Sequence, residues 1–155
     1  MNPPPGRIAG IDYGTVRVGI AVADVETAIA SPYENYTRRN PRLDAERFRR
    51  LVAEEGIVRF VVGLPVHLDG RESQKSAEAR QFGTWLAETT GIEVVFFDER
   101  FTTFDAEQHL AAAQLSKKKR KQRLDKLAAQ IMLSAYLEQL RTRGDEPVEP
   151  QGLDD

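Results

Sequence analysis

The sequence predicts an α/β fold in which a mixed five-stranded sheet is flanked by helices. Near the N-terminus, residues 7–24 form two apolar, β-rich runs on either side of a glycine, which is the pattern of a β-hairpin. Further along, two short apolar runs at residues 57–64 and 92–97 each follow a stretch with helical periodicity. Strands that alternate with helices pair in parallel through right-handed crossovers, so the later strands are expected beside the hairpin.

Length and composition limit the class of protein. With 155 residues the chain can form one domain with a real core, and without cysteine it has neither disulfides nor a thiolate metal site. No apolar run reaches the length of a membrane span, and the proline-rich residues 1–6 lack the layout of a signal peptide. We therefore expect a cytoplasmic protein with no membrane partner.

The distribution of charge matters more than the net charge of −2. Residues 144–155 contain five acidic residues, two prolines and no basic residue, which predicts a disordered acidic tail. The body of the chain is then mildly basic. The expected domain organisation is a disordered N-terminus over residues 1–6, a single domain over residues 7–143 and this tail.

The hairpin is expected to have a tight turn at Gly14-Thr15, and residues 27–36 are expected to form a third strand. Pro32 cannot donate a hydrogen bond to a neighbouring strand, so the third strand should lie at an edge of the sheet or contain a bulge. Gly10, Gly14 and Gly19 leave room beside Asp12, and a glycine in a strand often marks the close approach of a ligand or of another backbone.

Capping residues predict where the first helices begin and end. Asn40-Pro41 suits a helix start and Gly56 a helix end. A second helix is expected from about Ser73 to Thr89, ended by Gly91. The residues expected to face inward from this helix are Ala77, Phe82, Trp85 and Leu86.

After the strand at residues 92–97, the sequence predicts a short helix over about residues 103–114, a basic segment, and a long amphipathic helix from Leu124 to about Arg141. The resulting order of elements is that of the ribonuclease H-like arrangement, although order alone does not single out this arrangement. The residues expected on or near the buried stripe of the long helix are Leu124, Leu127, Ala128, Ile131, Ala135 and Leu137.

Three acidic residues stand where such a sheet can bring them together. Asp12 lies within the first strand, Glu99 follows the carboxyl end of the last strand, and Asp125 opens the final helix. Carboxylates without cysteine favour a hard cation such as Mg²⁺ or Mn²⁺. Two such ions can activate water and stabilise the leaving oxygen when a phosphodiester is cleaved.

Each acid also has a purely structural interpretation. Asp12 could accept hydrogen bonds from local backbone amides, and Asp125 could oppose the dipole of its helix. Glu99 could form an ion pair with Arg100 or Arg123. The combination of all three acids favours the metal site.

A basic run directly precedes Asp125. Its side chains could bind the charged groups of a polyanion beside the metals, although such a run can also be a solvated link between helices. The residues of this basic run are Lys117, Lys118, Lys119, Arg120, Lys121 and Arg123.

Four motifs follow one another along the chain. They are Gly10-Ile11-Asp12-Tyr13-Gly14 with Arg17-Val18-Gly19-Ile20-Ala21, then Gly63-Leu64-Pro65 with Asp69-Gly70, then Asp98-Glu99-Arg100-Phe101-Thr102-Thr103, and finally residues 125–133. In order and spacing they resemble the YqgF/RuvX family of Holliday-junction resolvases. The resemblance covers residues 7–140.

The resemblance implies a ribonuclease H-like fold and a divalent-metal endonuclease whose acids match Asp12, Glu99 and Asp125. It implies nucleic acid as the partner, either branched DNA in Holliday-junction resolution or precursor ribosomal RNA at the 5′ end of pre-16S rRNA. The chain departs from the family pattern at Val16, where many relatives carry a lysine, so one contact with the substrate is expected to be missing.

Under this hypothesis, the phosphates of the substrate are contacted by the basic run and by several further residues. Arg17 and Arg100 are candidates by charge, and Thr102 and Thr103 because they stand at the start of a helix. Symmetric cuts in a junction favour a homodimer, whereas trimming an RNA end suits a monomer.

Two other functions are compatible with the sequence. A non-catalytic nucleic-acid-binding or ribosome-assembly factor would keep the fold and the basic run, but the presence of all three acids argues against it. An ATP-binding protein of the actin and sugar-kinase type would share the pattern Asp12-x-Gly14-Thr15. Those proteins hold nucleotide between two such domains, and this chain has the length of one.

Overall fold

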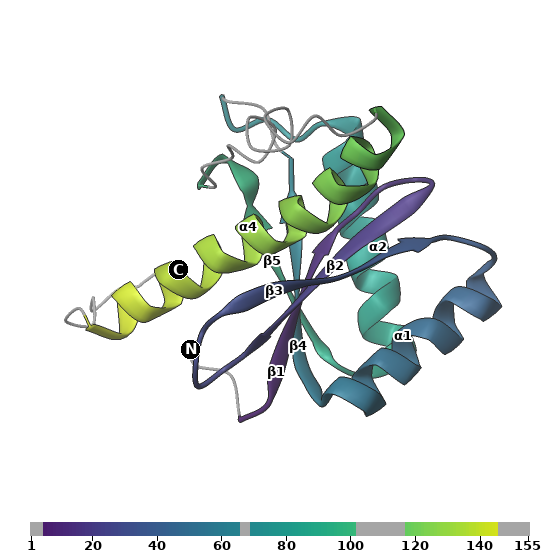
Figure 1. Cartoon of the computed structure of the whole chain (residues 1–155). Helices are drawn as coiled ribbons and strands as arrows, with labels where there is room; N and C mark the ends of the chain where they lie inside the picture. The colour runs from purple at the N-terminus through teal and green to yellow at the C-terminus, as the bar shows by residue number, and fades with distance from the viewer. Residues whose placement is uncertain (1–4, 66–68, 102–116, 146–155) are drawn as a thin grey trace.

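The computed structural model describes residues 5–65, 69–101 and 117–145. Five strands form one sheet in the order β3-β2-β1-β4-β5 (Figure 1). β1 pairs antiparallel with β2, which pairs antiparallel with β3, whereas β4 is parallel to both β1 and β5. The predicted mixed five-stranded sheet is therefore confirmed. The strands are β1 (Arg7–Asp12), β2 (Arg17–Asp24), β3 (Ala30–Thr37), β4 (Ile57–Leu64) and β5 (Glu93–Asp98).

Helices cover both faces of this sheet. α1 (Pro41–Glu55) and α2 (Gln74–Thr90) pack against each other and against one face, while α4 (Lys117–Asp145) crosses β1, β2 and β3 on the other face (Figure 1). A short 3₁₀ turn, η1 (Glu99–Phe101), follows β5 directly. In the part of the chain that the structure describes, no helix combines the length and apolarity that crossing a membrane requires.

The helix caps lie where the sequence predicts them. The side chain of Asn40 accepts a hydrogen bond from the backbone amide of Leu43 at 2.9 Å, and Ser73 caps α2 in the same way through the amide of Ser76. Both helices end at a glycine with left-handed backbone angles, Gly56 (φ 65°) and Gly91 (φ 74°). These local signals fix the ends of α1 and α2 because each satisfies backbone groups that the helix leaves unpaired.

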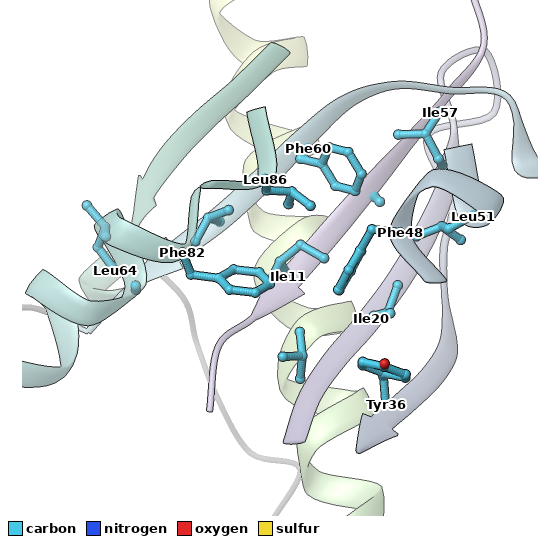
Figure 2. Packing of buried hydrophobic residues seen from close by; sticks show 14 residues of the cluster. Ile11, Ile20, Tyr36, Phe48, Leu51, Ile57, Phe60, Leu64, Phe82 and Leu86 are labelled. Carbon is cyan, nitrogen blue, oxygen red and sulfur yellow. The ribbon is translucent and has the colours of Figure 1, made fainter. Parts of the chain in front are cut away.

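Aromatic rings fill the core between the sheet and α1 and α2 (Figure 2). The ring of Phe48 meets those of Tyr36, Phe60 and Phe82 edge-on, with centroids 5.7–6.4 Å apart. Phe82 and Leu86 are buried, as predicted, whereas Trp85 is only partly buried. Ala77 is exposed, so its predicted inward position is wrong. The buried alanine of α2 is Ala79, two residues further along the helix.

On the other face, the buried stripe of α4 differs from the predicted one. Among the residues with described side chains, Leu137 is buried as predicted, whereas Leu127, Ala128, Ile131 and Ala135 are only partly buried. The side of α4 that meets the sheet is the one that carries Leu133 and the carbonyl of Ala129, which lie against Gly10. The residues of α4 that are buried are Ala129, Met132, Leu133 and Leu137.

Gly10 is the point of closest approach between α4 and the sheet. A Cβ atom at this position would lie 2.9 Å from the Cβ of Leu133 and 3.2 Å from the backbone oxygen of Ala129. Both separations are shorter than ordinary van der Waals contact, so the bare backbone of Gly10 allows the helix to pack this closely.

A buried arginine joins the same helix to the sheet. Arg59 of β4 is 5% exposed and donates hydrogen bonds to the Glu93 carboxylate and to the Tyr136 hydroxyl, each at 2.8 Å. Because Tyr136 belongs to α4, this network fixes the position of the helix over β4 and β5.

Three boundaries differ from the prediction. The last pair between β1 and β2 is Asp12 with Gly19, and the strands are joined by residues 13–16, a wider connection in place of the tight turn. α4 begins at Lys117, so the basic run is helical and is not a link between helices. α4 also continues to Asp145, into the segment predicted as a tail, and the predicted helix over residues 103–114 lies outside the described residues.

We predict that Gly10→Ala destabilises the protein by about 1–3 kcal/mol, because the added methyl group forces α4 away from the sheet. The free energy of unfolding, measured by urea denaturation, tests this. Ser134→Ala on the exposed side of α4 is the control and should change it by no more than about 0.5 kcal/mol. Equal stability of Gly10→Ala and the wild type would contradict the proposed packing.

Candidate active site

Asp12 is the last residue of β1 and lies on the face of the sheet that α4 covers. Side chains alternate along a strand, so Asp12 shares its face with Ile8 and Gly10. Ile8 packs in the cluster formed with α4, and Gly10 contacts α4 directly. Asp12 itself is partly exposed, and a residue that binds a ligand has to be accessible in this way.

Glu99 follows β5 and turns back over the neighbouring strand. A Cβ atom on Gly63 of β4 would lie 2.2 Å from Oε2 of Glu99, so the carboxylate occupies the space that a side chain at this position would fill. Gly63 shares its face with Val61, which packs in the cluster beneath α4. The Glu99 carboxylate therefore lies on the same face of the sheet as Asp12.

The strand register brings these two acids together. In the parallel pairing of β1 with β4, Ile11 lies opposite Val62. The next position along each strand is Asp12 on β1 and Gly63 on β4. Since Glu99 lies over Gly63, the two acids stand at the carboxyl ends of adjacent parallel strands, the usual place for a site in an open α/β sheet.

Asp125 belongs to the first half of α4, and its side chain lies outside the described residues. Its backbone position is four residues before Ala129, whose carbonyl lies at Gly10. Residues four apart share one face of a helix. Position 125 therefore lies one turn along α4 from the contact with Gly10, and Figure 1 shows this end of the helix above the end of the sheet that carries the β1–β2 connection.

Burial raises the pKa of the Glu99 carboxyl above its usual range, because the ionised form loses hydration. The positive charge of Lys75 lowers this pKa and the negative charge of Asp98 raises it, but burial is the largest cause. Among the described residues, none forms a hydrogen bond or salt bridge with the Glu99 carboxylate. A bound cation would supply the missing positive charge.

Arg100, a predicted phosphate contact and an alternative partner of Glu99, is held by Asp98. Its Nε donates to Oδ2 of Asp98 at 2.9 Å and its Nη2 donates to the same oxygen at 2.5 Å. These hydrogen bonds from Arg100 hold the pKa of the Asp98 carboxyl below its usual range. Within the described residues Arg100 thus neutralises Asp98, and the alternative pairing with Glu99 is wrong.

A cleft of about 520 Å³ opens beside Asp12. One wall is the β1–β2 connection with Arg17, and the other is the first turns of α2 with Lys75 and Glu78. Val16, where the resemblance predicts a departure from the family pattern, also lines the cleft and is 60% exposed. Lys75 was missed by the sequence analysis, and its only signal was its place in the first turn of the helix after the Asp69-Gly70 motif.

The other predicted site residues lie in two regions. Thr102 and Thr103 lie outside the described residues, and the basic run from Lys117 to Arg123 forms the first turns of α4, with side chains that are likewise outside. Among the described side chains no group of three or more acidic, histidine or cysteine residues has the arrangement of a metal site. Asp12 and Glu99 supply two of the three predicted acids, and the third is Asp125.

The geometry agrees with a comparison against known protein families. A family model described as RuvX, Holliday junction resolvase, matches residues 6–139.

The chain belongs to the RuvX family.

Two curated relatives that match most of the chain agree with this assignment. A protein of Rhodopirellula baltica, provisionally named a pre-16S rRNA nuclease, is 48% identical over 143 residues, covering 92% of this chain and 83% of the relative. A protein of Koribacter versatilis with the same name is 36% identical, covering 92% of this chain and 94% of the relative. Membership in RuvX confirms the prediction of a nuclease that acts on nucleic acid.

Solved structures confirm the ribonuclease H-like fold. Thermus thermophilus RuvC in complex with a Holliday junction substrate superimposes with a TM-score of 0.56 at 16% identity, covering 88% of this chain and 96% of that one. The yeast mitochondrial Holliday junction resolvase Ydc2 gives a TM-score of 0.52 at 11% identity, covering 94% and 84%. At these identities the likeness concerns the fold.

Glu99→Gln is predicted to raise the free energy of unfolding at neutral pH in the absence of divalent metal. The raised pKa means that the folded state prefers the protonated carboxyl, so stability falls as the pH rises from the pKa of the unfolded chain to that of the folded state, and the full cost is present above both. The gain should shrink as the pH falls through this range and the wild type becomes protonated.

Urea denaturation at neutral and acidic pH measures this difference. Glu88→Gln, an exposed acid of α2, serves as the matched control and should leave stability nearly unchanged at both values. A Glu99→Gln protein less stable than the wild type at neutral pH would show that a favourable partner holds the carboxylate.

Proposed function

We propose that this RuvX-family chain is a divalent-metal-dependent endonuclease in which Asp12, Glu99 and Asp125 hold the metal. The observation that carries the proposal is the position of the Glu99 carboxylate over Gly63, at the end of the strand beside Asp12. A carboxylate that is partly buried, and that has no described hydrogen-bond or salt-bridge partner, is suited to a cation.

The donor set fits Mg²⁺ or Mn²⁺, because both ions prefer carboxylate oxygens to softer ligands. When bound, such ions activate water and stabilise the leaving oxygen of a phosphodiester. The residues of the chain have separate tasks. Gly63 leaves the space in which Glu99 lies, while Arg17 and Lys75 on opposite walls of the cleft attract and orient the phosphate.

Two structured nucleic acids are candidates for the substrate. The family model is described as a Holliday junction resolvase, and the curated relatives are provisionally named pre-16S rRNA nucleases. The basic run at the start of α4 supports either, because phosphate contacts carry no sequence information. Junction resolution would require a homodimer with two symmetric sites, whereas processing of pre-16S rRNA suits a monomer in the cytoplasm.

The site requires Asp12. We expect Asp12→Asn to abolish cleavage while leaving binding of nucleic acid largely intact, because the substitution removes a metal ligand and leaves the phosphate contacts in place. Purified protein is assayed with Mg²⁺, Mn²⁺ or chelator on a mobile four-way DNA junction and on a fragment of ribosomal-RNA precursor. Glu88→Gln is the matched control and should cleave like the wild type.

The products separate the two substrates. Paired symmetric cuts in the junction would establish a resolvase, and cleavage confined to the RNA would establish a processing nuclease. If Asp12→Asn cleaves as fast as the wild type, Asp12 has no part in the reaction. Tight binding without cleavage by the wild type would support a binding factor instead.

A further inference from the structure

A second, smaller hollow adjoins the cleft. It has a volume of about 220 Å³ and shares Tyr13 and Glu78 with the cleft, so the two spaces are neighbours. Pockets that hold drug-sized molecules measure roughly 300–1,000 Å³, so this hollow suits a single small ring system. The other residues that carry the argument are Arg38, Gln81, Phe82 and Trp85.

Planar groups form the walls of this hollow. The ring centroid of Phe82 lies 5.2 Å from that of Tyr13 and 5.4 Å from that of Trp85. The guanidinium of Arg38 lies over two of these rings, 5.3 Å from the centroid of Tyr13 and 5.5 Å from that of Phe82. A flat ligand could therefore stack either on an aromatic ring or on the guanidinium plane.

The guanidinium of Arg38 is held in a fixed orientation. Its Nη1 donates to the Tyr13 hydroxyl at 2.9 Å, and its Nε lies 3.7 Å from Oδ2 of Asp44. Asp44 is itself fixed by hydrogen bonds from the Tyr36 hydroxyl at 2.6 Å and the backbone amide of Arg39 at 2.9 Å. A prearranged plane loses little entropy when a ligand stacks on it.

The hollow is more open than a core cluster. Phe82 belongs to the hydrophobic core at 5% exposure, whereas Tyr13 and Trp85 are only partly buried and the Arg38 side chain is 31% exposed. Gln81 is exposed one turn before Trp85 on α2, and its amide can both donate and accept hydrogen bonds at the edge of a ring. Planar walls with a polar edge fit a heterocycle better than an aliphatic group.

We infer that this hollow binds one unstacked base of the nucleic-acid substrate, beside the phosphate held in the cleft. The inference rests on the proposed function, since it places the base next to the scissile strand. Single-stranded nucleic acids bind proteins through bases stacked on aromatic rings or on arginine planes, with the backbone in an adjoining basic groove. The end of an RNA strand and a splayed nucleotide of a DNA junction share this chemistry.

Trp85 allows a direct test because it is the single tryptophan of the chain. The full-length protein is titrated in chelator with short single-stranded RNA and with DNA of the same sequence, each with its bases or with abasic residues. Binding is followed separately by anisotropy of an end label. We expect saturable quenching of Trp85 by the strands that carry bases, and roughly tenfold weaker binding of the abasic strands.

Quenching of equal size by abasic strands, or none while anisotropy reports binding, would overturn the inference and leave the proposed nuclease intact. Failure of all strands to bind would also overturn the inference alone, because the nuclease is tested separately on structured substrates. Quenching by RNA alone would show that the hollow accepts bases of RNA, and quenching by both strands would show that it accepts bases of either nucleic acid. Each of these results supports the hollow as a base site.

Substitutions at Trp85 separate stacking from a structural role. Trp85→Leu keeps an apolar side chain and removes the ring, so it should weaken binding of base-carrying strands roughly tenfold and leave abasic strands unchanged. Trp85→Phe should restore part of the difference, and Thr84→Ala, exposed beside it, should behave like the wild type. Equal weakening of both kinds of strand by Trp85→Leu would assign Trp85 a structural role and overturn the inference.

Discussion

The candidate site depends on two positions in adjacent parallel strands where a side chain is absent. Gly10 of β1 lets α4 lie against the sheet, and Gly63 of β4 leaves the space that the Glu99 carboxylate occupies. Both positions lie on the same face and near the same end of the sheet. A methyl group at either one would separate the elements that bring Asp12, Glu99 and the start of α4 together, since close-packed interiors do not absorb added volume freely.

The treatment of buried charge distinguishes this site from the rest of the molecule. Arg59 is 5% exposed and is satisfied by Glu93 and Tyr136. Asp44 is 4% exposed and accepts the Tyr36 hydroxyl, whose pKa is raised to about 12 by burial and then by Asp44, so the phenol remains a donor at neutral pH. Glu99 is partly buried without such a partner among the described residues. Unsatisfied groups of this kind are costly, and their retention points to function.

Much of this arrangement could be predicted from sequence because its signals are local. Asn40 and Gly56 mark the ends of α1, and the element order gives the sheet. The packing of α4 could not be predicted in this way. Hydrophobicity favours Ile131 over Ala129 as a buried residue, but the face of α4 that meets the sheet is set by the contact of Leu133 and the Ala129 carbonyl with Gly10. The charge of Lys75 lowers the pKa of the Glu99 carboxyl only because the tertiary fold brings the two residues near each other. No local sequence pattern therefore indicated that Lys75 belongs to the site.

Binding of Mn²⁺ to the full-length protein, followed by the electron paramagnetic resonance signal of the free ion, tests the central claim most directly. If Asp12, Glu99 and Asp125 share one metal site, then Asp12→Asn, Glu99→Gln and Asp125→Asn should each weaken binding by at least roughly tenfold, whereas Glu88→Gln should not. Wild-type affinity in Glu99→Gln or Asp125→Asn would contradict the claim, because the acid concerned would then have no part in holding the metal.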